Sequence, residues 1–414
     1  MAEGARPRDG KDVEAAVLWA LGEAKALEVV GRGSKRGIGR PSQTDLTLDL
    51  SGLAGVTLYE PDELILSAKA GTPLAEIEAL VAENGQELAF EPMDYGPVLG
   101  GPAGEASIGG VLAANLSGPR RIRAGAARDH FLGVTAVSGR GETFKSGGRV
   151  VKNVTGYDLC KLLAGSWGTL AVMTHVTIKT LPKAEAEETL LIAGLDDAKA
   201  IAAMTAAMGS AGEVSGAAHL PSGVAGAIPA GEIAGAGAAV TALRLEGVPP
   251  SIAHSNAMLE GAMGRFGPLA TIRDGMSRTF WRSVRDVTPL AASRSGTEGA
   301  LWRISTAPRR GAELGALLTR TNAAELLYDW AGGLVWAALP ALDPDLDDAG
   351  AQLVRRATAM VGGHATLIRA PAAVRAAVDV FEPQEPGLAG LGRRVKESFD
   401  PMRVLGPGRM YAGV

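Results

Sequence analysis

The chain has 414 residues, of which 46% are hydrophobic, and 41 basic against 45 acidic residues give a formal charge of −4 at pH 7. This length predicts a globular protein of two or three domains. The near balance of charge excludes a general attraction to nucleic acid or to an anionic membrane, so we expect neither as a partner and expect any phosphate site to be local.

Cysteine content and hydropathy further restrict the kinds of site and the cellular location expected for this protein. The single cysteine, Cys160, leaves no internal disulfide and no cysteine-ligated zinc or iron–sulfur site in this chain. The first residues lack the apolar core of a signal peptide, and no apolar run reaches the roughly 18 residues of a membrane helix. We therefore expect no transmembrane segment and a cytoplasmic location.

The first glycine-rich loop follows a short strand. An amphipathic helix is predicted over 12–22 and a strand over 27–30, which leads directly into G-R-G-S-K-R-G-I-G at 31–39. A solvated basic turn is one interpretation, but a glycine loop with three cations directly after a strand favours a diphosphate cradle. Arg36 stands where the G-x-G-x-x-G motif needs its third glycine, and Walker A is absent, which argues against a Rossmann domain or a P-loop.

The next elements predict an α+β order. Strands are expected over 45–50, 56–60 and 64–68, followed by a helix with Thr72 as its N-cap and by extended chain at 87–91. Several strands before one helix do not give the regular alternation of a doubly wound sheet.

The stretch from Val98 to Gly118 is the second glycine-rich segment, with six glycines among small apolar residues. Glycine at this density is expected where backbone closely approaches a ligand. Four arginines lie within nine residues directly after it, between Arg120 and Arg128. They form either a solvated charged surface or, beside such a loop, the cationic half of an anion site.

A second region with its own sheet is expected after Pro182. Before it, strands over 132–138 and 142–145 and a helix, glycine loop and strand between 156 and 182 complete the first region. Beyond Ala184, predicted strands alternate with alanine-rich helices, which indicates a sheet covered by helices on one side. The segment 210–238 is predicted to be a surface excursion.

The side chains themselves offer little chemistry. No nucleophile elbow, H-E-x-x-H motif or paired-histidine helix is present, and the five histidines are far apart, so we expect no metal. A bound cofactor is then the expected source of reactivity. Two glycine segments about seventy residues apart could hold a long diphosphate ligand, for which FAD is the natural candidate.

Several motifs in this order resemble the FAD-binding domain of the vanillyl-alcohol oxidase type, also called PCMH-type. The motifs that carry this resemblance are G-R-G-S-K-R-G-I-G, Leu46 to Leu53, A-G-T-P-L-A-E-I (Ala70 to Ile77), A-S-I-G-G-V-L-A-A-N-L-S-G (Ala106 to Gly118), G-A-A-R-D-H-F-L-G-V (Gly125 to Val134), Lys152 to Leu170, and the ending F-D-P-M-R-V-L-G-P-G-R-M. The resemblance implies an α+β fold with a PCMH-type two-subdomain FAD-binding domain and an α+β cap with a ferredoxin-like sheet. The implied divisions are 1–182 for the FAD domain, 183–375 for the cap, and 376–414 for a C-terminal segment returning to the FAD domain.

Within that family, the segments Tyr328 to Trp336, Leu301 to Ser305 and Gly362 to Pro371 most resemble the FAD-binding E subunits of bacterial glycolate oxidases. This resemblance implies FAD, a second flavoprotein subunit, an iron–sulfur subunit, and oxidation of glycolate to glyoxylate with electrons passed to the partners. Peripheral attachment to the inner membrane through those partners is a further implication. The alternative is an assembly subunit whose flavin site turns over no substrate.

Carried over to this sequence, the resemblance also implies the site residues. The expected cofactor-binding residues are Arg32, Gly33, Ser34, Lys35, Arg36, Ser107, Ile108, Gly109, Gly110, Asn115, Ser117, Gly118, Arg128, Asp129, Gly165, Thr169 and Val172. Arg285 matches the cap arginine that binds a substrate carboxylate in relatives, and His364 matches a catalytic histidine. Where relatives hold a metal, Leu334 to Trp336 contain no histidine and Gly363 replaces a glutamate, so a single imidazole remains and no metal is expected.

Overall fold

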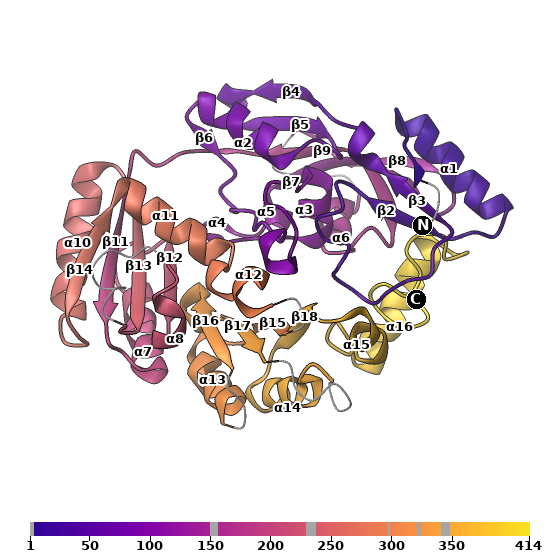
Figure 1. The fold of residues 1–414 in the computed structure, drawn as a ribbon. Helices are drawn as coiled ribbons and strands as arrows, with labels where there is room; N and C mark the ends of the chain where they lie inside the picture. The colour runs from indigo at the N-terminus through magenta and orange to yellow at the C-terminus, as the bar shows by residue number, and fades with distance from the viewer. Residues whose placement is uncertain (1–3, 150–155, 229–236, 297–298, 321–323, 341–347) are drawn as a thin grey trace.

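The computed structural model describes residues 4–149, 156–228, 237–296, 299–320, 324–340 and 348–414 (Figure 1). Its N-terminal part opens with β1 (Gly4–Ala5), α1 (Gly10–Gly22), β2 (Leu27–Val30) and β3 (Leu46–Asp49), and the strands form a small parallel sheet in the order β1-β3-β2. The Asp9 carboxylate accepts hydrogen bonds from the Lys11 and Asp12 amides and so caps α1. Buried residues on one side of α1 pack against this sheet.

A five-stranded antiparallel sheet forms the body of the N-terminal half. Its order is β4-β5-β9-β7-β8, with β4 (Val56–Glu60), β5 (Ile65–Lys69), β9 (Ala171–Lys179), β7 (Phe131–Ser138) and β8 (Thr143–Gly147). The accompanying elements are α2 (Leu74–Glu83), β6 (Gln86–Glu87), α3 (Ile108–Ala114), α4 (Arg121–Ala124), α5 (Ala127–His130), α6 (Leu159–Leu163) and β10 (Leu181–Pro182). The apolar sides of α2 and α3 share one core with this sheet, and most of α3 is buried.

The expected start of α2 was wrong. The helix begins at Leu74 with Pro73 in the cap position, and the cap residue makes no side-chain hydrogen bond. The Thr72 hydroxyl instead donates to the Lys69 carbonyl (2.6 Å) and accepts from the Gly55 amide (3.0 Å). The Thr72 hydroxyl is therefore used in contacts to Lys69 and Gly55 and does not cap the helix as predicted.

The cap is an eight-stranded antiparallel sheet made of two β-α-β-β-α-β units. The first unit contains β11 (Ala186–Ala193), α7 (Asp197–Met208), β12 (Gly216–Leu220), β13 (Val240–Gly247), α10 (Pro249–Met263) and β14 (Leu269–Arg273). The second contains β15 (Ala300–Ser305), α13 (Gly311–Thr319), β16 (Glu325–Asp329), β17 (Leu334–Leu339), α14 (Ala351–Val361) and β18 (His364–Arg369). The order β14-β11-β13-β12-β16-β17-β15-β18 is the ferredoxin-like order twice, joined edge to edge by β12 and β16.

The two faces of the cap sheet have different neighbours. Helices α7, α10, α13 and α14 cover one face, as predicted, and share a core with it (Figure 1). The other face shares its core with the N-terminal half and with α11 (Asp274–Arg285). Every strand in the second unit therefore presents alternate side chains toward the N-terminal half, and the sheet register decides which ones.

The predicted surface excursion at 210–238 was wrong. This segment contributes β12, an inner strand whose five residues are all buried, and then α8 (Ser222–Ala225). Its glycines and alanines suit a crowded sheet interior, where a Cβ at Gly216 would lie 3.1 Å from the Trp281 ring. Residues 229–236 of this segment, and Lys152 to Thr155 of the motif quoted above, lie outside the described residues.

The C-terminal segment runs from the cap back to the N-terminal sheet (Figure 1). After α12 (Ala292–Ser295) and the second cap unit come α15 (Ala372–Ala377) and α16 (Pro386–Phe399). Leu405 bridges to Leu27 in a parallel pairing, and the buried Lys396 ammonium donates to the Thr169 carbonyl (2.7 Å), the Leu405 carbonyl (3.0 Å) and Asp400 (2.8 Å). In the part of the chain that the structure describes, no helix combines the length and apolar character needed to cross a bilayer.

Candidate functional site

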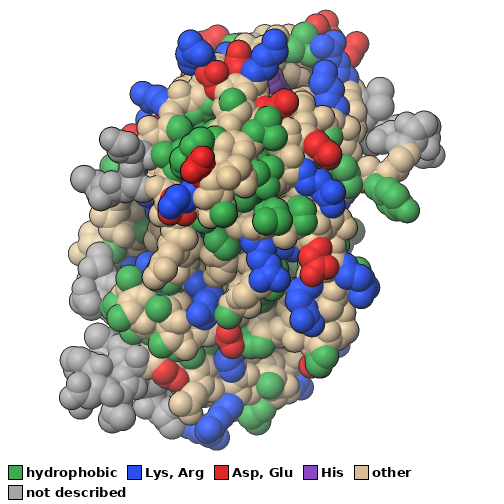
Figure 2. Space-filling view, turned by 90° about the vertical axis from the view of Figure 1, so that its right-hand side faces the viewer, with side chains coloured by type: hydrophobic (Ala, Val, Ile, Leu, Met, Phe, Trp, Pro, Cys, Tyr) green, Lys and Arg blue, Asp and Glu red, His purple; other side chains and the backbone are tan. Residues whose placement is uncertain are grey.

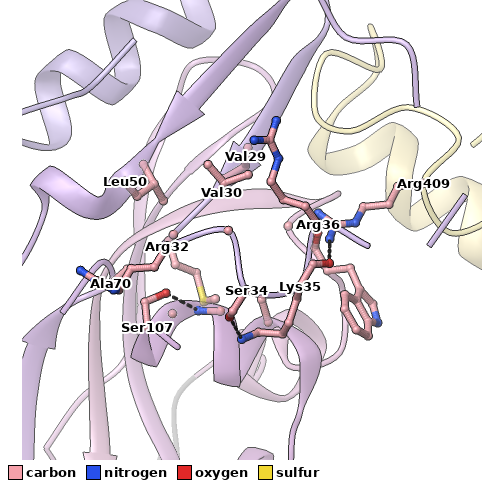
Figure 3. A pocket seen from close by; sticks show the side chains of 18 of the residues that line it. Val29, Val30, Arg32, Ser34, Lys35, Arg36, Leu50, Ala70, Ser107 and Arg409 are labelled. Carbon is pink, nitrogen blue, oxygen red and sulfur yellow. Dashed lines mark hydrogen bonds between the residues drawn. The ribbon is translucent and has the colours of Figure 1, made fainter. Parts of the chain in front are cut away.

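The two glycine-rich segments meet at a cavity beside the first turn of α3 (Figure 3). Ser107 is the N-cap of α3, and the preceding chain lies so close to the loop after β2 that a Cβ at Gly31 would stand 2.1 Å from the Ser107 hydroxyl. A Cβ at Gly109 would stand 2.7 Å from the Ala70 carbonyl oxygen. A Cβ at Gly109 would therefore clash with backbone, and a Cβ at Gly31 would clash with the Ser107 side chain that caps α3. From the predicted set, this cavity is lined by Arg32, Gly33, Ser34, Lys35, Arg36, Ser107, Gly109 and Gly110.

Lys35 is the buried cation of this first cavity. Its side chain is 8% exposed, it crosses the first turn of α3, and its ammonium donates to the Ser34 hydroxyl at 3.0 Å. Among the described residues no carboxylate lies within ion-pair distance of it. Burial lowers the pKa of Lys35 to about 8. A buried ammonium without an ion-pair partner, such as that of Lys35, is suited to bind an anionic ligand.

The neighbouring arginines differ in what they already bind. Arg32 forms an ion pair with Glu105 (2.6 Å), and Arg36 forms one with Glu28. Their charges are therefore compensated by carboxylates from other segments, although both residues line the cavity.

Arg409 is a cavity residue that the sequence analysis did not select. It comes from the C-terminal segment, and its guanidinium donates to the Lys35 carbonyl (3.2 Å) and the Trp167 carbonyl (3.5 Å) (Figure 3). Burial lowers its pKa, and no carboxylate in the described structure pairs with it at ion-pair distance. The ending G-P-G-R-M, which resembled the family's return segment, was the signal that could have identified it.

A second cavity lies between the C-terminal end of α3 and the cap sheet. Ala113 lines the first cavity and Ala114 the second, while Trp167 lines both. From the predicted set, Asn115, Ser117, Gly118, Gly165, Arg285 and His364 all line this second cavity. Four of the predicted cofactor residues and the two predicted catalytic residues thus line one cavity, in which Arg285 lies against Gly118.

The strand register of the cap sheet determines which cap residues line the second cavity. Asp329, Leu334, Ser305 and His364 are successive cross-strand partners on β16, β17, β15 and β18. Two residues along each strand, the next row contains Trp336, Arg303 and Thr366. Residues two apart share a face, so Arg303 lies on the same wall as Asp329 and His364. All of these except Ser305 line the second cavity.

Three arginines line this cavity, and they are not equivalent. The Arg285 guanidinium makes two hydrogen bonds to its neighbour Asp286, at 2.9 and 2.8 Å. Arg121 and Arg303 instead lie over the Trp330 ring, with their guanidinium carbons 4.4 and 5.0 Å from its centre. No described carboxylate lies within 4.0 Å of either. The two cations free to pair with an anion are therefore Arg121, which belongs to the arginine cluster predicted to lie at an anion site, and Arg303, which no sequence pattern had indicated.

The remaining predicted residues lie away from both cavity walls. Ile108 and Val172 are fully buried core residues, and the Thr169 hydroxyl donates to the Ser166 carbonyl. Arg128 and Asp129 are exposed. The Arg128 amide donates to the Asn115 side chain (3.0 Å), so Arg128 holds Asn115 in the wall of the second cavity without lining the cavity itself.

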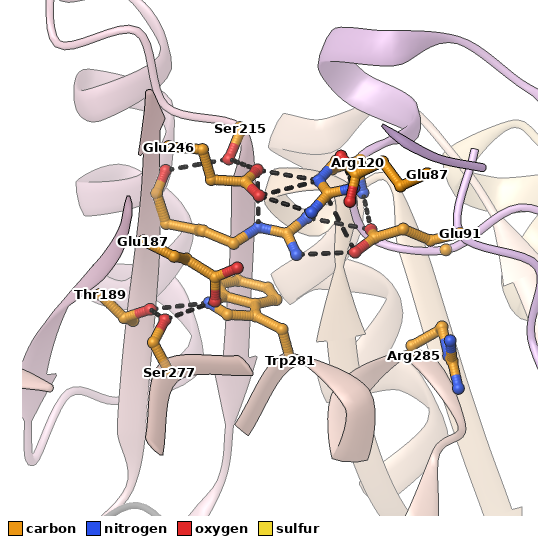
Figure 4. A network of polar contacts seen from close by, with 12 residues as sticks. Glu87, Glu91, Arg120, Glu187, Thr189, Ser215, Glu246, Ser277, Trp281 and Arg285 are labelled. Carbon is orange, nitrogen blue, oxygen red and sulfur yellow. Dashed lines mark hydrogen bonds and ion pairs between the residues drawn. The ribbon is translucent and has the colours of Figure 1, made fainter. Parts of the chain in front are cut away.

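A buried ion network joins the N-terminal half to the cap (Figure 4). Arg244 on β13 is 1% exposed, and it donates to both oxygens of Glu91 at 2.8 and 3.0 Å. Arg120 pairs with Glu246 (2.6 Å) and with Glu87 (2.7 Å). The Arg244–Glu91 and Arg120–Glu246 pairs cross from one half of the protein to the other, whereas the Arg120–Glu87 pair lies within the N-terminal half at the same boundary.

The same network holds the segment that lines the second cavity. Glu91 accepts the Arg120 backbone amide (2.7 Å), and the two arginines hold the pKa of Glu91 at about 2 against the opposing effect of burial. The Gly118 amide donates to the Phe90 carbonyl, and the Trp330 indole donates to the Gly118 carbonyl at 3.0 Å. The cap and the segment from Gly118 to Arg120 are therefore fixed relative to each other.

No cluster of three or more His, Cys, Asp and Glu side chains in the described part of the chain has the arrangement of a metal site. His364 is exposed at the start of β18, and partial desolvation together with Arg303 lowers its pKa.

Comparison with known proteins adds to this geometry. The FAD binding domain family matches residues 4–147. The glycolate oxidase subunit GlcE of Escherichia coli K12 is 31% identical over 406 residues, which cover 96% of this chain and 95% of GlcE. The glycolate oxidase subunit GlcD of Bacillus subtilis 168 is 31% identical over 134 residues, which cover 32% of this chain and 27% of GlcD.

Among solved structures, p-cresol methylhydroxylase with substrate bound superposes with a TM-score of 0.75 at 14% identity, covering 99% of this chain and 88% of that one. This likeness confirms the expected PCMH-type fold. Because the similarity to GlcE extends over nearly the full length of both proteins, this chain belongs to the GlcE family of glycolate oxidase subunits and carries an FAD-binding domain, with FAD as its cofactor.

Proposed function

We propose that this chain is the FAD-carrying subunit of a glycolate oxidase that converts glycolate, or a closely related 2-hydroxy acid, to the 2-oxo acid. Electrons then pass to a second flavoprotein subunit and an iron–sulfur subunit. The observation that carries the proposal is the second cavity, where Arg121 and Arg303 have no described carboxylate partner. A small carboxylate is the ligand such a pair of guanidinium groups recognises.

The first cavity fits the diphosphate of FAD. Lys35 and Arg409 supply positive charge without a carboxylate at ion-pair distance among the described residues, and both line the cavity beside the first turn of α3. Gly31 and Gly109 line this cavity, and a Cβ at either position would clash with Ser107 or Ala70 and displace the wall. We propose that Lys35 and Arg409 hold the diphosphate, while Arg32 and Arg36 shape the loop through their own ion pairs.

The flavin end of FAD fits the second cavity. The two cavities share Trp167 and lie at opposite ends of α3, so a long ligand can follow the helix from one to the other. Asn115, Ser117, Gly118 and Gly165 then face the flavin ring. When bound there, FAD supplies the two-electron oxidant for the substrate.

The substrate is proposed to lie between that wall and the cap sheet. Arg303, with Arg121, pairs with the substrate carboxylate, and the indole of Trp330 keeps both guanidinium groups oriented. Arg285 keeps its proposed place beside the substrate, but its two hydrogen bonds to Asp286 make it a secondary contact. His364 closes the cap-side wall as a neutral imidazole, because its pKa lies below the ordinary value.

We also propose the division into a FAD domain at 1–182, a cap at 183–375 and a returning segment at 376–414. Separate sheets for the first two parts and the Leu27–Leu405 bridge for the third support it. Contact with the inner membrane through the partner subunits belongs to the same proposal.

Anaerobic addition of glycolate to the FAD-loaded chain tests the function. Loss of the oxidised flavin's visible absorbance, with one 2-oxo acid formed per flavin, is the expected result. A flavin that stays oxidised with glycolate and other small 2-hydroxy acids, in a chain that still assembles with its partner subunits, would identify an assembly subunit without its own turnover. Arg303→Met should raise the substrate concentration needed for half-maximal reduction while FAD stays bound, whereas the exposed Arg309→Met serves as a matched control.

A further inference from the structure

Asp329 is a buried carboxyl group on the wall of the second cavity. It is the last residue of β16, and its side chain is 3% exposed. One carboxylate oxygen, Oδ1, accepts the Trp330 amide at 2.7 Å. The other, Oδ2, has no hydrogen-bond partner among the described residues, and Asp329 lines the same cavity as Arg303 and His364.

The backbone after Asp329 is held in an uncommon conformation. Trp330 and Ala331 both have positive φ angles, +51° and +57°, although neither is glycine. Two consecutive left-handed residues cost about 1–3 kcal/mol each and persist only where surrounding contacts impose them. Here the Trp330 indole is bonded to Gly118 and stacked by Arg121, so the contacts that fix the cavity wall also fix Asp329.

We propose that Asp329 is the proton acceptor for the substrate hydroxyl, a role that rests on the proposed oxidation of a 2-hydroxy acid in this cavity. The hydroxyl proton moves to Asp329 Oδ2, and the hydrogen on C2 leaves with its electron pair to FAD. The C2–O bond becomes a carbonyl, so the substrate loses two electrons and FAD gains them. The resulting carboxylic acid returns its proton to solvent before the next turnover.

The charges around Asp329 suit a base that works near neutral pH. Burial raises the pKa of Asp329 to about 7, and Glu91 adds to that effect, while the Trp330 amide, Arg244 and Arg303 oppose it. A carboxylate with a pKa near the working pH combines a useful ionised fraction with good proton affinity. Arg303 also places a cation beside it that can hold the substrate carboxylate.

Other charged groups face this space from the elements packed around Asp329. They are Arg121 from α4, Arg285 from α11, Tyr95 from the N-terminal half and His364 from β18. The pKa of Tyr95 is raised by burial and that of His364 is lowered, so neither changes charge just above neutral pH. Titration of the cavity in that range is therefore assigned to Asp329.

The experiment compares Asp329→Asn and Asp329→Ser with wild type as FAD-loaded full-length chains. Both replacements keep an oxygen that can accept the Trp330 amide, which guards against loss of the fold. The matched control is Asp197→Asn, whose carboxylate bonds Tyr328 (2.5 Å) and His219 (3.3 Å) on the helix-covered side of the sheet. Flavin content is measured first, followed by oxalate binding from the perturbed flavin spectrum and the anaerobic rate of flavin reduction by glycolate across the neutral pH range.

Three results are expected. Reduction in both Asp329 variants slows by about 10²–10⁴-fold. Oxalate binds at least as tightly as in wild type, because an anionic neighbour has been removed. Oxalate affinity in wild type falls as pH rises through Asp329 ionisation, and this dependence disappears in the variants but persists in Asp197→Asn.

Two results would overturn the proposal. Reduction rates and oxalate pH dependence that match wild type in both variants would reject Asp329 as the proton acceptor and leave the proposed function intact. A wild-type holoprotein that neither binds oxalate nor is reduced by any 2-hydroxy acid would reject both the proposed function and this role.

Discussion

Replacing Lys35 by methionine should separate the cost of burying its charge from the benefit of binding FAD. In the folded chain without ligand, the ammonium is 8% exposed and its pKa falls from 10.5 to about 8. That fall corresponds to about 3 kcal/mol of destabilisation at pH 7. Methionine keeps the apolar stem without the charge, so the FAD-free Lys35→Met variant should be more stable to unfolding by about 2–3 kcal/mol.

FAD affinity should move in the opposite direction. If Lys35 donates a charge-assisted hydrogen bond to the diphosphate, its loss removes about 1.5–3 kcal/mol of binding free energy. The dissociation constant for FAD should then rise about 10- to 150-fold. In wild type, affinity should also weaken as pH rises through about 8, because the ammonium loses its proton, and this pH dependence should be absent from the variant.

Two measurements check this prediction. Urea unfolding of the FAD-free chain gives the change in stability, and quenching of FAD fluorescence on titration gives the affinity. Lys25→Met is the control, because Lys25 forms an exposed ion pair with Asp45 and should change neither quantity appreciably. A Lys35→Met variant that binds FAD as tightly as wild type would refute the placement of the diphosphate in the first cavity.

Three further predictions concern residues contributed by distant segments. Arg409→Gln removes a buried cation from the first cavity and should weaken FAD binding about 10- to 100-fold, as measured by equilibrium dialysis. Arg403 is exposed and serves as the control, so equal weakening by Arg403→Gln would contradict this prediction. Arg244→Met removes both guanidinium hydrogen bonds to the buried Glu91 and should lower the free energy of unfolding by about 3–5 kcal/mol at pH 7. The folded chain holds the pKa of Glu91 at about 2, so the stability that Glu91 contributes is present above its ordinary pKa and is lost as pH falls. The loss of stability in Arg244→Met should therefore become smaller in acid. A loss of stability that does not depend on pH would argue against the network. Lys396→Met should expose the C-terminal segment to limited proteolysis and weaken FAD binding as well, whereas unchanged digestion would show that the segment is held by other contacts.

Much of the site could be predicted from the sequence because it depends on glycine. The loop after β2 passes within contact distance of the Ser107 side chain at Gly31, and α3 approaches the Ala70 backbone at Gly109, so a Cβ at either position would clash. Such positions leave a local signature that needs no knowledge of the partner segment. The two glycine-rich loops were accordingly predicted from local sequence, whereas the ferredoxin-like cap was implied only by the family resemblance.

The prediction for 210–238 failed for the converse reason. A segment rich in glycine and alanine reads as a loop, yet β12 uses small residues because the neighbouring strands and Trp281 leave little room. Burial on both faces is a property of the assembled sheet, and no local pattern of alternating polarity marks such a strand.

The glycine-rich loops and their cations are readable in the sequence and indicate a cofactor site, but which cations remain without a carboxylate partner depends on the tertiary structure. Arg32 and Arg36 lie in the first loop, and carboxylates outside that loop, on Glu105 and Glu28, neutralise them. Lys35 and Arg409 receive no such partner among the described residues. The cap-side wall was likewise decided by strand register, which aligns Asp329, Arg303 and His364 from three strands on one face. Ion pairing and register depend on residues far apart in the chain, so they are fixed only when the sheets have formed.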